Sequence, residues 1–65
     1  MKTKPLTYEE MKQRLERDPE SGRETGCCEW LCGYPLPCHK TMTLQECFDK
    51  HPGGQTTFGA GEYCG

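Results

Sequence analysis

Six cysteines carry most of the chemistry that this sequence can offer, and all of them lie between residues 27 and 64. Cysteine forms disulfides in oxidising compartments, whereas clustered cysteines in reducing compartments more often bind metal as thiolates. One of these two arrangements is therefore expected to hold this stretch of the chain together. The positions are Cys27, Cys28, Cys32, Cys38, Cys47 and Cys64.

Two pairs of candidate metal ligands have the spacing of one helical turn. Cys28 and Cys32 are four residues apart, and so are Cys47 and His51. Residues at positions i and i+4 share one face of a helix, so two such turns could close a tetrahedral site with three sulfur ligands and one nitrogen ligand. Our first hypothesis is that these four residues bind a structural zinc ion, the cofactor that the sequence implies.

The alternative is a set of disulfides, because an even number of cysteines in a short chain is typical of a disulfide framework. Neighbouring cysteines such as Cys27 and Cys28 can hardly bridge each other without strain, and the other pairings stay open. The sequence also lacks the Cys-x2-Cys knuckle of ordinary zinc fingers. This alternative describes a secreted effector: a toxin, an inhibitor or a signalling peptide.

Length and composition exclude several other functions. A chain of 65 residues with 32% hydrophobic residues buries too little apolar surface to fold without staples. Its net charge of -2 argues against nucleic-acid binding, and its short apolar runs argue against membrane insertion. No apolar signal segment follows Met1, which indicates a cytoplasmic protein; a secreted domain expressed behind an added Met would look the same.

No set of residues has the pattern of a catalytic site. Paired carboxylates, a Ser/His/Asp set and a phosphate-binding loop are all missing from the sequence. Cys38 and His39 are a nucleophile and a base in type, but neighbours in sequence rarely face each other. We therefore expect a protein that is not an enzyme.

The N-terminal part, residues 1–26, contains no cysteine and is rich in charge. Thr7 and Glu10 form a capping box that predicts a helix from Thr7 to Asp18. Tyr8, Met11 and Leu15 make an apolar stripe on it, which packs on the rest of the chain or docks on a partner; the third alternative is a frayed tail. Residues 20–26 have the composition of a mobile polar linker. The expected division is a charged N-terminal helix with its linker, 1–26, and a cysteine-rich core, 27–65.

Within the cysteine-rich core, residues 27–32 could form one helical turn. Thr43 and Glu46 make a second capping box, which predicts a helix from Thr43 to His51. In the tail, residues 55–65, the sequence predicts a short strand at 56–58 and loop elsewhere, and the two prolines predict an extended segment at 34–37. The predicted fold class is a small cysteine-rich protein, stapled by disulfides or metal, mostly irregular with two short helices.

Two aromatic residues are the predicted partner-binding site. Trp30 and Tyr34 flank Gly33 beside two prolines, in a segment whose backbone is stiff, and such aromatic residues often dominate interface energies. With Leu31 and Leu36 they form the densest apolar group of the sequence, which either makes the small core around the sulfurs or stays exposed as a binding patch. In the first of these interpretations Trp30 belongs to the core. The sequence thus predicts a small binding or regulatory protein with a protein partner and a zinc-stapled core; the alternatives are the secreted effector and a precursor with a leader and a modified core.

Overall fold

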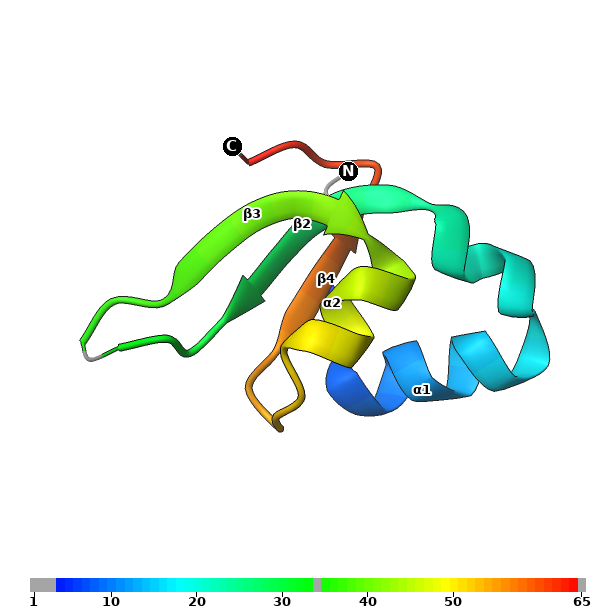
Figure 1. The fold of residues 1–65 in the computed structure, drawn as a ribbon, viewed down its shortest axis with the longest axis horizontal. Coiled ribbons are helices and arrows are strands. Elements are labelled where there is room, and N and C mark those ends of the chain that lie inside the picture. The colour runs from blue at the N-terminus through cyan, green and yellow to red at the C-terminus, as the bar shows by residue number, and fades with distance from the viewer. Residues whose placement is uncertain (1–3, 34, 65) are drawn as a thin grey trace.

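The computed structural model describes residues 4–33 and 35–64, which form two helices packed against a small antiparallel sheet (Figure 1). This confirms a small cysteine-rich protein with two short helices, stapled by disulfides, and it adds a sheet of four strands. The elements are β1 (Leu6–Thr7), α1 (Tyr8–Arg17), the 3-10 helix η1 (Pro19–Arg23), β2 (Thr25–Trp30), β3 (Cys38–Thr43), α2 (Leu44–Lys50) and β4 (Thr57–Ala60).

The sheet has the strand order β1-β4-β2-β3, and each neighbouring pair is antiparallel. β2 lies in the interior, with Cys28 opposite Lys40 of β3 on one side and opposite Phe58 of β4 on the other. The ladder between β2 and β3 ends at the pair Trp30 and Cys38. Beyond that pair the chain forms a loop that projects away from both helices (Figure 1).

Both helices begin at the capping boxes that the sequence predicts. Thr7 accepts a hydrogen bond from the Glu10 backbone N–H at 3.2 Å, and the Glu10 carboxylate accepts one from the Thr7 backbone at 3.0 Å. Thr43 and Glu46 repeat this arrangement at the start of α2. In each box the backbone N–H of the threonine lowers the pKa of the glutamate below its ordinary value of 4.5.

The hydrophobic core lies between the helices and one face of the sheet. α1 contributes one fully buried side chain and α2 contributes two, and they meet two buried side chains of β2 and β4. Only five side chains make up this buried cluster, which fits a chain that needs covalent staples. They are Met11, Cys28, Leu44, Cys47 and Phe58.

Residues 27–32 do not form the helical turn that their spacing suggests. Thr25–Trp30 is strand β2, and its side chains alternate between the two faces of the sheet. Cys28 points into the core and is fully buried, whereas Cys27 faces the opposite side and is half-buried. Because neighbours in a strand point in opposite directions, the two adjacent cysteines bridge to different parts of the chain.

Three disulfides are nested inside one another along the chain. Cys28–Cys47 joins β2 to α2 through the core, and Cys27–Cys64 joins the other face of β2 to the C-terminal tail. Cys32–Cys38, the innermost bridge, closes the loop between β2 and β3 with a sequence separation of 6. Such bridges are typical of an oxidising environment rather than of the cytoplasm, which corrects the localisation that the sequence suggests.

The N-terminal segment shares the core of the cysteine-rich part. Met11 of α1 is fully buried against that core, and Tyr8 and Leu15 pack at its edge. The expected linker is in part the 3-10 helix η1, in which Ser21 and Gly22 are buried. Among the described residues, no helix is long and apolar enough to cross a membrane.

Candidate functional site

The described residues of the loop between β2 and β3, 31–33 and 35–37, project from the body of the molecule (Figure 1), and we call them the tip. The strands β2 and β3 pair up to Trp30 and Cys38 and so support the loop at its base. The disulfide then closes the loop by joining Cys38 of that last pair to Cys32. In Figure 1 the tip is the end of the molecule that lies farthest from α1.

The tip carries two of the three large hydrophobic side chains that are most exposed among the described residues. Leu31 is 55% exposed and Leu36 is 76% exposed. Pro35 and Pro37, on either side of Leu36, are also exposed. Each proline fixes its own φ angle and restricts the residue before it, so Leu36 is presented on a backbone with few alternative conformations.

Trp30 lies at the base of the tip and is half-buried. Its indole stacks on the imidazole of His51, with ring centroids 3.6 Å apart and planes inclined by 14°. Trp30 therefore has a structural role on one of its faces, while it also borders a hollow between the tip and the loop after α2. That hollow is lined by Trp30, Leu31, Lys50, His51 and residues 52–56.

The four residues predicted to bind zinc do not come together as a metal site. Cys28 is bridged to Cys47, and Cys32 is bridged to Cys38, so their thiolates are not free to ligate a metal. His51 stacks on Trp30 instead. The residues that the structure describes contain no group of three or more His, Cys, Asp or Glu side chains that could hold a metal ion. The disulfide alternative thus accounts for these cysteines better than zinc does.

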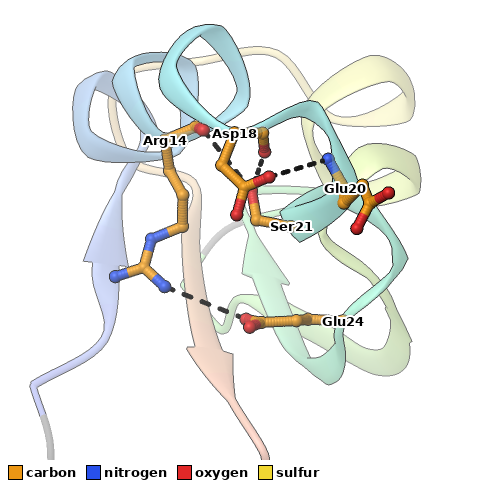
Figure 2. Close-up of polar contacts among 5 residues, drawn as sticks. All are labelled: Arg14, Asp18, Glu20, Ser21 and Glu24. Carbon is orange, nitrogen blue, oxygen red and sulfur yellow. Dashed lines mark hydrogen bonds and ion pairs between the residues drawn. The ribbon is translucent and has the colours of Figure 1, made fainter.

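A second cluster of polar residues lies where α1 meets η1 (Figure 2). The Asp18 carboxylate accepts a hydrogen bond from the Glu20 backbone at 3.2 Å, and the Ser21 hydroxyl donates to the Asp18 carbonyl at 2.7 Å. Arg14 faces Glu24 across 3.9 Å. The buried hydroxyl of Ser21 is satisfied within the chain, so this cluster orients α1 relative to η1.

Of the two residues predicted to bind a partner, Trp30 lies at the base of the tip, and Tyr34 falls outside the described residues. Leu31 and Leu36 belong to the apolar group that the sequence identifies as core or exposed patch, but they are not among the residues predicted to bind a partner. For Leu36 the identifying pattern is an apolar residue between two prolines inside a short loop closed by two cysteines, because such a loop has no core in which to bury it. Leu31, directly before Cys32, has no such local pattern.

Comparison of the chain with protein-family models, with curated proteins and with solved structures finds no match. The fold itself defines the class of protein: two helices on an antiparallel sheet, stapled by three nested disulfides. Its function must be inferred from the geometry of the chain.

Proposed function

We propose that this is a secreted, disulfide-stabilised binding protein whose tip contacts a protein partner and which catalyses no reaction. The observation that carries the proposal is the exposure of Leu31 and Leu36, at 55% and 76%: Leu36 lies inside a loop closed by a disulfide, and Leu31 lies directly before the first cysteine of that bridge. Exposed apolar side chains gathered on one part of a small protein are typical of interaction sites.

The construction of the tip favours binding because it reduces the entropy that is lost when a complex forms. The disulfide joins the two ends of the loop, and the prolines at 35 and 37 restrict the backbone around Leu36. A loop that is ordered before binding loses less conformational freedom on contact with a partner. Trp30 and Leu31, which line the adjoining hollow, extend the same surface toward α2.

The covalent framework supports action outside the cytoplasm. All six cysteines are bridged, and such a density of disulfides persists in oxidising compartments. With every sulfur in a bridge, the chain offers no thiolate as a nucleophile or as a zinc ligand. Contact with a partner is therefore favoured over catalysis and over regulation through a metal.

The burial of the N-terminal helix favours the secreted effector over a precursor whose leader is removed. Met11 of α1 is fully buried in the core, and β1 pairs with β4. Cleavage between residues 26 and 27 would remove α1 and β1 and expose the buried face of β4. We therefore treat residues 1–26 as part of the functional protein.

The proposal can be tested by capturing partners from extracellular fluid with three immobilised proteins. These are the wild type, a Leu31→Ser/Leu36→Ser variant, and a Tyr63→Ser control that removes an equally exposed apolar side chain, 80% exposed, from the C-terminal tail. A partner of the tip should be retained by the wild type and by the control, but not by the double variant.

The captured protein should then be purified and its affinity measured by calorimetry. We expect the double variant to weaken binding by at least about tenfold, the factor that corresponds to roughly 1.4 kcal/mol. Equal affinity of all three proteins for the purified partner would refute the assignment of the tip. The proposal would also fail if the wild type retained no protein that the double variant lacks.

A further inference from the structure

The three disulfides differ in how easily a reagent in solution can reach their sulfur atoms. Cys28 and Cys47 are both fully buried in the core. Cys27 and Cys64 are both half-buried, on the face of the sheet opposite the helices. Cys32, in the tip, is the one exposed cysteine among the six.

We propose that the Cys32–Cys38 bridge is a site of thiol–disulfide exchange, whose substrate class is a dithiol reductant. Exchange requires a thiolate to approach a disulfide sulfur directly, so exposure decides which bridge reacts first. The attacked atom is the Sγ of Cys32, because Cys38 is half-buried at the end of β3. Exposed disulfides are as a class the labile and regulatory ones.

The exchange proceeds in two steps that balance. A thiolate of the reductant bonds to the Cys32 sulfur, the bond between Cys32 and Cys38 breaks, and Cys38 leaves as a thiolate that takes up a proton. The second thiol of the reductant, once deprotonated, then attacks the first sulfur of the reductant, which is bonded to Cys32 in the mixed disulfide. Cys32 leaves as a thiolate and takes up a proton. The protein disulfide has gained two electrons and two protons, and the dithiol has become a disulfide.

The fold can tolerate the opening of this bridge because the tip lies outside the core. The last pair of the ladder, Trp30 and Cys38, lies at the base of the loop. None of the five buried core side chains belongs to the tip. The bridge spans only 6 positions of the sequence, against 19 and 37 for the other two. It therefore restricts the unfolded chain least of the three.

Opening the bridge would act on the surface that displays the exposed leucines. The loop that carries Leu31 and Leu36 would lose its covalent closure, while β2, β3 and the helices remain in place. Loss of that restraint raises the entropy cost of binding. The affinity of the tip for its partner should therefore be higher when the bridge is oxidised than when it is reduced. This consequence depends on the proposed binding function, whereas the exchange chemistry does not.

The exchange site is tested by reducing the native protein with increasing dithiothreitol and quenching free thiols with iodoacetamide. Intact mass and peptide mapping then count and locate the labels. We expect a species with two labels, at Cys32 and Cys38, to accumulate before any other, with the amide NMR shifts of α1, α2 and β4 unchanged. First labelling at any other pair, or simultaneous labelling of all six cysteines, would overturn the proposal.

Glutathione, a monothiol, identifies the attacked sulfur. After an iodoacetamide quench, one glutathione should be found on Cys32 and one carbamidomethyl group on Cys38; the reverse arrangement would overturn the assignment of Cys32. A Cys32→Ser/Cys38→Ser variant is the matched control and should never yield the early species with two labels. Because labelling needs no partner, its outcome is independent of the capture experiment, and the proposed function can fail while the exchange site stands.

Discussion

Replacement of Met11 by alanine tests whether the N-terminal helix belongs to the cooperative core. The Met11 side chain is fully buried and belongs to the same cluster as Cys28, Leu44 and Phe58. Truncation of a buried methionine to alanine costs about 2–5 kcal/mol. The total stability expected for 65 residues is only about 3–10 kcal/mol, at 0.05–0.15 kcal/mol per residue. A loss near 3 kcal/mol would thus remove roughly a third to all of the stability.

The assay is urea unfolding with disulfides intact, followed by the fluorescence of Trp30, the single tryptophan. Trp30 lies in β2, so its signal reports on α1 only if both unfold together. Lys12→Ala is the control, because Lys12 is an exposed neighbour on the same helix. Alanine is also the strongest helix former, so lower stability of the Met11 variant cannot arise from helix propensity. An unchanged Trp30 transition would refute the inclusion of α1 in the core.

Three further predictions concern the sheet, the N-terminal cap of α2 and the buried Cys28–Cys47 disulfide. Gly26→Ala would drive the new Cβ into the backbone of β4, so we expect a loss of about 1–3 kcal/mol or more in the same assay. The hydrogen bond from the Thr43 backbone lowers the pKa of Glu46 in the folded state. The ionised Glu46 therefore stabilises the folded protein above pH 4.5, and this stabilisation is lost as the pH falls through the lowered pKa. Glu46→Gln should therefore destabilise the protein at neutral pH, and its difference from the wild type should shrink on acidification in urea titrations. The Cys28→Ala/Cys47→Ala variant removes the bridge with a sequence separation of 19, and the chain-entropy contribution lost from the free energy of unfolding should be about 3 kcal/mol. Removing the tip bridge, with a separation of 6, should cost only about 2 kcal/mol by the same reasoning. Thermal melting of the two variants compares these losses.

The two helices could be predicted because their signals are local. A capping box needs only a threonine and a glutamate three residues later, and the hydrogen bonds that it predicts are present at Thr7 and at Thr43. The apolar stripe of the first helix also identified Met11, Tyr8 and Leu15 as a face that packs. Local chemistry of this kind does not depend on the rest of the fold.

The strand predicted at 56–58 overlaps β4, but β2 could not be predicted from the same sequence because it has few of the usual strand formers. Its inward positions hold Gly26, Cys28 and Trp30, so a cysteine and a glycine stand where valine or isoleucine would signal a strand. Gly26 is needed there because β4 passes too close for a side chain. The spacing of Cys28 and Cys32 fits a helical turn equally well, and only the pairing of distant strands decides between the two.

The proposed partner surface was predicted only in part, since exposure depends on which apolar residues the fold has room to bury. Trp30 was identified by its type, yet its stacking on His51 gives it a structural role that no local pattern shows. Leu31 and Leu36 are exposed because the ladder ends before them and the helices cover a different part of the sheet. Their exposure is thus a consequence of the topology.

The alternation of side chains in β2 explains how so small a core can support an exposed tip. Cys28 faces inward and anchors α2, while Cys27 faces outward and anchors the tail, so the strand is held on both faces. The outer two bridges join β2 to α2 and to the tail, whereas the innermost bridge closes the loop at the end of the ladder. In the proposed exchange, the tip changes its covalent state while the two outer bridges and the core of five side chains stay in place, and the chain-entropy cost of about 2 kcal/mol is the smallest among the three bridges.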